Sequence, residues 1–253
     1  MADAPIIDTR VSPSLHPDSL NGIPEADHED VQQLLQPALD ALAVGYQFVA
    51  SIYDVKAAAA IDPELTDEAA LLRTDDHARA RMERATKAFD SVHKQFTTSI
   101  NALEIGLSSA VEAKASAMVS GEIRQHFKSL DSKERIAQLE AALERKDEVT
   151  LSSVLGAPSY LSGLPAELHA VMLRRFNELR DPIASKRLRV LTATRDAMME
   201  RGQVLLREMV TAIGDLEVRL PGPDGKSFGT RKVSVNEVRR KRDAARAAYA
   251  RAS

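Results

Sequence analysis

Cysteine is absent from the 253 residues of this chain, so neither a disulfide nor a thiolate-bound zinc site can form. Tryptophan is also absent, and aromatic residues make up only 4% of the chain, against 44% for hydrophobic residues as a whole. With so few rings, the core has to come from helices that pack small and medium side chains against one another. The eleven glycines and eleven prolines are clustered, which favours long helices over many short strands.

A membrane-spanning run and a signal peptide are also missing. The longest candidate for a span, residues 41–53, is bounded by Asp40 and Asp54. It is about a dozen residues long, whereas a transmembrane helix needs roughly 20. The N-terminus has no basic region followed by an apolar run. We therefore expect a soluble protein without membrane contact, located in the cytoplasm or, if a phage encodes it, in the virion.

Apolar residues recur at intervals of three and four over most of residues 27–216, which places them on one face of an α-helix. The longest stripe follows the polar cluster at residues 74–76 and covers about 45 residues, or roughly 65 Å of helix. This length predicts an all-α fold, an elongated helical bundle with long coiled-coil-like helices. The stripe consists of Ala85, Phe89, Val92, Phe96, Ile100, Leu103, Leu107, Ala110, Val111 and Met118.

The chain divides into three segments by pattern. Residues 1–26 contain four prolines and no helical period, so we expect a disordered N-terminal arm. Residues 27–216 form the predicted bundle. In residues 217–253 two short extended stretches predict a small β-hairpin near 217–235, and the capping pattern from Ser234 to Glu237 predicts a basic C-terminal helix.

Residues 151–164, LSSVLGAPSYLSGL, carry no charge and separate two strongly helical regions. We interpret this stretch as a packed corner that joins the helical arm 75–146 to the arm 165–216. A packed corner predicts that Leu155, Leu161 and Leu164 are buried.

No catalytic constellation stands out. Residues 222–227, GPDGKS, end like a phosphate-binding loop, but Leu220 stands where that motif needs a glycine, so we interpret them as a hairpin tip. Two pairs of histidine and carboxylate can share a helix face, but neither has the further ligands of a carboxylate-bridged metal site. We expect no catalytic residue, no metal, no cofactor and no enzymatic activity. The two pairs are Asp90–His93 and Glu122–His126.

Charge is distributed unevenly along the chain. Residues 1–80 hold 4 basic and 15 acidic side chains, whereas residues 219–253 hold 10 basic and 3 acidic ones. The basic C-terminal helix could contact nucleic-acid phosphates, dock on an acidic surface of a partner or of another copy, for instance the first third, or remain a solvated tail. These three alternatives stay open. The predicted contact residues are Arg239, Arg240, Lys241, Arg242 and Arg246.

An Ala-rich helical chain with a proline-containing N-terminal arm and a basic C-terminal helix resembles helical proteins of unknown function that bacteriophages and prophages encode. Residues 154–158 (VLGAP) and 161–164 (LSGL) carry this resemblance, and no functional residue follows from it. It implies a virion or assembly protein. We therefore expect a non-enzymatic structural protein that contacts copies of itself or other structural proteins. The alternative is an accessory protein that binds nucleic acid through its basic helix.

Overall fold

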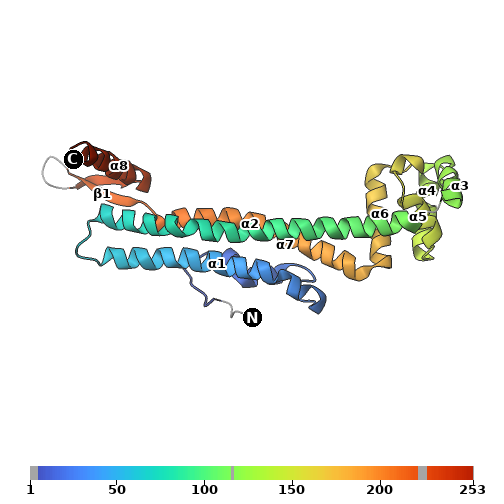
Figure 1. Ribbon diagram of the computed structural model, residues 1–253, viewed down its shortest axis with the longest axis horizontal. Helices are drawn as coiled ribbons and strands as arrows, with labels where there is room; N and C mark the ends of the chain where they lie inside the picture. Colours follow the sequence, from blue (N-terminus) through green and yellow to red (C-terminus); the bar gives the residue numbers. More distant parts are fainter. Residues whose placement is uncertain (1–4, 115–116, 222–226, 253) are drawn as a thin grey trace. The chain divides into compact units, whose positions relative to one another are not determined.

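The computed structural model describes residues 5–114, 117–221 and 227–252 (Figure 1). The described residues are mostly helical, which confirms the all-α helical bundle with long helices, and a two-stranded antiparallel sheet confirms the small hairpin. None of the described helices has the length and hydrophobicity needed to span a membrane. In chain order the elements are η1 (Pro13–Leu15), η2 (Pro17–Gly22), α1 (Glu29–Ala60), α2 (Asp67–Lys114), α3 (Ala117–Ser129), α4 (Ser132–Glu144), α5 (Glu148–Leu155), η3 (Ser159–Leu161), α6 (Ala166–Arg180), α7 (Pro182–Ile213), β1 (Leu216–Pro221), β2 (Ser227–Val233) and α8 (Val235–Ala252).

The chain folds as two compact units, and α1, α2 and α7 each contribute residues to both. These units cut across the segments 1–26, 27–216 and 217–253 that the sequence pattern suggested, because a long helix can pass from one unit into the next without a break in its periodicity. The first unit consists of Met1–Gly22, Leu35–Lys94 and Thr194–Ser253, and the second of Ile23–Leu34 and Gln95–Ala193.

Three helices of the first unit, α1, α2 and α7, pack side by side and meet at Gly45 (Figure 1). A Cβ atom at this position would lie 2.9 Å from the ring of Phe89 on α2 and 3.3 Å from the side chain of Leu205 on α7. Glycine therefore allows the three helices to come this close. The predicted stripe of α2 is confirmed where its side chains are described and buried, at Ala85, Phe89, Val92, Phe96, Ile100, Leu107 and Val111. The side chains of Ala110 and Met118 lie outside the described part.

The start of α2 differs from the prediction. The helix begins at Asp67, whereas the sequence predicted a new helix at the polar cluster 74–76. The Thr74 hydroxyl donates to a backbone carbonyl one turn earlier at 3.0 Å, and the Asp75 carboxylate accepts from Arg79 one turn later at 3.1 Å. Side chains that often cap a helix are thus satisfied inside one, so they do not mark a boundary.

The prediction of a disordered N-terminal arm over residues 1–26 is also wrong where the structure describes this segment. Pro13–Leu15 and Pro17–Gly22 form η1 and η2 within the first unit, while residues 1–4 lie outside the described part. The Arg201 guanidinium on α7 donates to the carbonyl oxygens of Ser14 and Ser19 at 3.1 and 3.0 Å. The prolines exclude a regular α-helix but begin short 3₁₀ turns, and the apolar residues beside them have a core to cover. The buried side chains are Val11, Leu15 and Leu20.

The second unit encloses a separate core, into which the neutral stretch 151–164 folds. Its first residues belong to α5, so only residues 156–164 act as a connector. Leu155 and Leu164 are buried as predicted, but Leu161 is 40% exposed, because the η3 turn leaves this side chain outside the core. The core residues are Val111, Phe127, Leu139, Ala142, Leu143, Leu151, Val154, Leu155, Leu164, Met172 and Phe176.

Arg135 on α4 ties three segments of the second unit together. Its guanidinium donates to the carbonyl oxygens of Phe127 at 2.8 Å and Leu130 at 2.7 Å, at the end of α3. It also donates to the carbonyl of Gly163 in the connector. Gly163 has φ +71° and lies against the guanidinium, so a side chain there would be both strained and crowded. One cation therefore satisfies the open carbonyls of a helix end and holds the connector.

Substitution of Arg135 should destabilise the second unit. Lysine keeps the charge, but its single nitrogen cannot reach all the carbonyls that the guanidinium contacts through three separate nitrogens, so we expect Arg135→Lys to lower the free energy of unfolding by about 2 kcal/mol. Urea denaturation of the full chain, followed by circular dichroism, measures this change. Lys133→Ala, an exposed position on the same helix, should change it by less than about 0.5 kcal/mol. Equal midpoints for the two variants would show that the Arg135 contacts contribute nothing.

Candidate interaction surfaces

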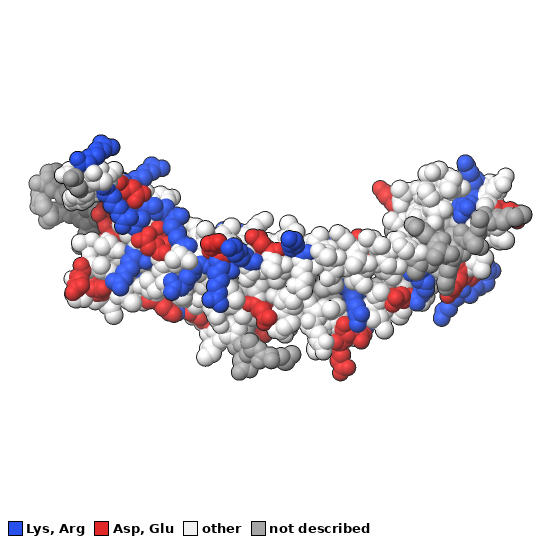
Figure 2. Space-filling model, in the orientation of Figure 1, with Lys and Arg blue, Asp and Glu red and all other residues white. Residues whose placement is uncertain are grey.

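The predicted basic helix, α8, docks on the beginning of α2 within the first unit. Val238 in the first turn of α8 is buried, and three ion pairs join α8 to α2. Figure 2 shows basic and acidic side chains next to one another over this part of the first unit. The pairs are Arg239 with the Asp75 carboxylate, Lys241 Nζ with Glu68 Oε1 at 3.1 Å, and Arg242 with Asp76 Oδ2 at 2.6 Å.

The structure thus divides the five predicted contact residues into two groups. Arg239, Lys241 and Arg242 bind acidic residues in the first third of the same chain, whereas the docking predicted from the sequence was on a partner or another copy. Arg240 and Arg246 are exposed and form no ion pair with any described residue. A contact of these two arginines with a partner or with nucleic acid stays a prediction.

Asp75 is the buried centre of the α8 contact. Its side chain is 1% exposed and lies between Arg79 of its own helix and Arg239 of α8. Exposed ion pairs contribute little to stability, but removal of one partner from a buried pair leaves an uncompensated charge. The neighbouring pair is more exposed at Asp76, whose hydrogen bond raises the pKa of the Arg242 guanidinium. Asp75 should therefore contribute most to holding α8 in place.

The second half of α8, after Arg242, is not covered by the described part of the chain. Every described residue from Asp243 to Ala252 is exposed, including Tyr249. Among the apolar residues of this helix, Val238 is buried, whereas Ala245 and Tyr249 are exposed.

A second surface lies on α7 and was missed in the sequence. Met199, Leu206 and Val210 are 55%, 46% and 64% exposed, and the exposed Gln203 lies among them. We call these four residues the α7 stripe. All four belong to the first unit. Side chains of the other face of α7, such as Met198 and Leu205, are buried.

A sequence signal for the α7 stripe does exist. Met198–Met199 and Leu205–Leu206 are adjacent apolar pairs, seven residues apart, and Met209–Val210 follows. Neighbouring residues in a helix point about 100° apart, so each pair supplies two different faces. The first member of each pair is buried, or half-buried in the case of Met209, and the second member belongs to the α7 stripe.

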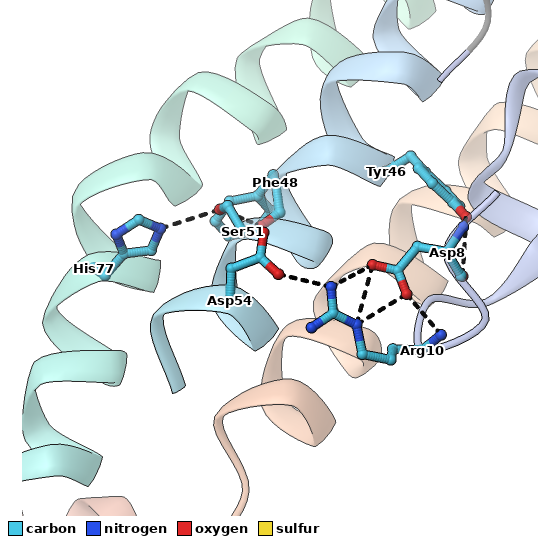
Figure 3. Close-up of polar contacts among 7 residues, drawn as sticks. All are labelled: Asp8, Arg10, Tyr46, Phe48, Ser51, Asp54 and His77. Atoms are coloured by element: carbon cyan, nitrogen blue, oxygen red, sulfur yellow. Dashed lines mark hydrogen bonds and ion pairs between the residues drawn. The ribbon is translucent and has the colours of Figure 1, made fainter. Parts of the chain in front are cut away.

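A histidine joins α1 and α2 in the first unit. The Ser51 hydroxyl donates to the Phe48 carbonyl at 2.7 Å, so it accepts from His77 Nε2 at 3.1 Å (Figure 3). The Arg81 guanidinium donates to His77 Nδ1 at 2.9 Å. A catalytic serine–histidine pair is oriented by a carboxylate, and here the third group is a cation. Burial and the charge of Arg81 both lower the pKa of His77, which favours the neutral ring.

The N-terminal segment is tied to α1 by polar contacts that Figure 3 also shows. The Arg10 guanidinium bridges the carboxylates of Asp8 and Asp54, and its closest contact to Asp54 is 2.7 Å. Hydrogen bonds from Arg10 hold the pKa of Asp8 below its usual value. The Tyr46 hydroxyl donates to the Asp8 carbonyl at 3.0 Å. These contacts join an extended segment to a helix and leave no side chain poised for chemistry.

A hollow of about 670 Å³ lies between α3 and α4 in the second unit. Small residues such as Ala137 and Ala141 line it, and the predicted pair Glu122–His126 lies beside them. His126 Nε2 is 3.2 Å from Gln138 Oε1, so this hydrogen bond occupies one of the two ring nitrogens of His126. Within the described residues no group of three or more side chains could hold a metal ion.

His77 should make stability depend on pH. Because its pKa is lower in the folded chain than in the unfolded one, protonation favours unfolding. We expect the free energy of unfolding to fall as the pH drops below about 6.5, the usual histidine pKa. Urea titrations at several pH values measure this slope. His77→Gln should reduce the slope, whereas His126→Gln, at an exposed position, should leave it. Identical slopes in both variants would contradict the role of His77.

Neutralisation of Asp75 should loosen α8. Asp75→Asn keeps the shape of the side chain but leaves two guanidinium groups without their shared carboxylate, so we expect a loss of about 1.4 kcal/mol, or tenfold faster amide exchange in α8. Hydrogen–deuterium exchange of the full chain detects this change. Glu68→Gln removes a more exposed ion pair and is the control, with little expected effect. The assignment fails if exchange in α8 is the same in both variants.

Comparison with known protein families, curated proteins and solved structures finds no match to this chain. The similarity to phage-encoded helical proteins therefore stays a prediction. Any function has to be inferred from the surfaces described above.

Proposed function

We propose that this protein acts by binding other proteins, as a structural or assembly component, and that the α7 stripe is its contact surface. The observation that carries this proposal is the exposure of three large apolar side chains in one line on α7. Single exposed apolar residues are common on monomers. A continuous row on a regular helix is instead typical of surfaces that receive another helix.

The position of the α7 stripe supports this proposal. The other face of α7 is fixed by Met198 and Leu205, which are buried in the first unit. A helix held in this way presents its outer residues without further ordering, so little conformational entropy is lost on binding. Each half-exposed side chain that a partner covers adds roughly 25 cal/mol for every Å² of apolar surface removed from water.

A nucleic-acid contact through α8 is the second candidate, supported by the exposure of Arg240 and Arg246. Binding to phosphates releases counterions roughly in proportion to the number of cations that make contact. Three of the five predicted cations already bind carboxylates of the same chain, which leaves a weak electrostatic contact. Protein binding is therefore the better supported of the two, and a virion or cytoplasmic location belongs to the same proposal.

The proposal predicts that charge on the α7 stripe abolishes protein binding. In Leu206→Glu/Val210→Glu, two carboxylates replace apolar side chains that a partner would bury, so capture of proteins by the purified, immobilised chain should fall at least roughly tenfold. Quantitative mass spectrometry of the captured proteins, including added copies of the chain itself, measures this loss. Thr211→Glu, exposed on another side of the same helix, is the matched control. If the double variant and the control capture the same proteins in equal amounts, the α7 stripe is not the contact surface.

A further inference from the structure

We infer that the partner of the α7 stripe is the α7 stripe of a second copy of this chain, paired antiparallel about a two-fold axis. This inference rests on the proposed function and names its partner. The spacing of the exposed residues, the charges beside them and a gap on the other flank each point to this arrangement.

The spacing of the α7 stripe is the same when it is read in either direction. Its residues stand at positions 199, 203, 206 and 210, with intervals of four, three and four. These are alternating d and a positions of a heptad repeat, the spacing that forms a coiled-coil seam. In an antiparallel pair Met199 packs beside Val210 of the second copy, and Gln203 beside Leu206 of the second copy. Two-fold symmetry repeats both layers, so four residues on each copy cover one another.

Charges on one flank match the antiparallel direction. Glu200 and Arg207 are exposed, stand seven residues apart on the same side of the α7 stripe, and form no ion pair with any described residue. An antiparallel coiled coil brings the same flank of both helices together, so Glu200 of one copy lies near Arg207 of the second copy, twice. In a parallel pair these residues would face the other flank, where Gly202 and Met209 carry no charge.

The other flank has complementary shapes. Gly202 has no side chain and is partly exposed, with its nearest neighbour, the Phe89 ring, 3.8 Å from the position of a Cβ atom. The antiparallel arrangement places the half-buried Met209 of the second copy beside this gap. A flexible thioether fills such irregular spaces well.

This contact is small, since it contains four layers of side chains. Interfaces below the usual size are weak, so the pair should form at high concentration and dissociate on dilution. Two of the four layers pair Gln203 with Leu206 of the other copy, which lowers the affinity further but fixes the register.

Cysteine cross-linking tests the direction, because the chain has no cysteine of its own. A mixture of Met199→Cys and Val210→Cys should give a disulfide-linked heterodimer on a non-reducing gel, at least roughly tenfold above the dimer from either variant alone, because Met199 and Met199 of the second copy lie about 16 Å apart along the axis, beyond disulfide reach. Thr211→Cys is the control for collisions and should give only background.

Other results would overturn the inference. Efficient dimers from each variant alone would show a parallel pair. Background cross-linking in every sample, with a monomeric mass in sedimentation equilibrium, would show that a second copy is not the partner. The proposed function would still stand in that case if Leu206→Glu/Val210→Glu loses other captured proteins, and it would fail if capture is unchanged.

Charge reversal gives an independent measurement that leaves the apolar residues intact. Glu200→Arg alone and Arg207→Glu alone each bring like charges together, so the dissociation constant should rise several-fold, and the double variant should restore it. Sedimentation equilibrium of the full chain measures these constants, with circular dichroism as the check on folding. Equal dissociation constants for wild type, both single variants and the double variant would contradict the antiparallel pairing.

Discussion

The close approach of three helices at Gly45 is the constraint on which the first unit depends. With few aromatic rings available, α1, α2 and α7 bury small and medium side chains by packing near one another, and Phe89 occupies the space that glycine leaves. In such a bundle each helix buries only part of its circumference against its neighbours. The apolar residues on the outer face of α7 have no role in this packing, so the same constraint that explains the core also leaves the α7 stripe uncovered.

Ion pairs hold the C-terminal helix α8 against the beginning of α2 in the first unit. The acidic beginning and the basic end of the chain attract one another within one molecule, and Asp75 is buried where they meet. Three of the basic residues that suggested a separate partner are therefore paired inside the fold. Among the five predicted contact residues, only Arg240 and Arg246 are exposed without an ion pair to any described residue. The exposed apolar side chains of α7 are therefore a better candidate for a contact surface than the charges of α8.

Caps, turns and helical period in the sequence predicted the structure correctly where interactions between nearby residues determine it. The pattern at Ser234–Glu237 caps α8, where the Glu237 N–H donates to the Ser234 hydroxyl at 3.3 Å, and the hairpin and the buried side of α2 follow from turn residues and period. Prediction failed where tertiary contacts decide. Asp75 is held inside α2 by Arg239 of α8, and Leu15 is buried although prolines flank it; composition shows neither contact. The α7 stripe was missed because a search for one apolar face assigned Leu205 and ignored Leu206 beside it.

Symmetry limits what the α7 stripe can build. A two-fold contact uses the same surface on both copies, so it closes at two and cannot by itself extend an assembly. Growth beyond a pair would need a second surface, unrelated to the first by that axis. Among the described residues, the outer half of α8 meets this condition, because Asp243 to Ala252 are exposed on a helix whose first turns are fixed by ion pairs. The proposed symmetric contact on α7 and the exposed half of α8 would together give an assembly component the two independent surfaces that growth requires.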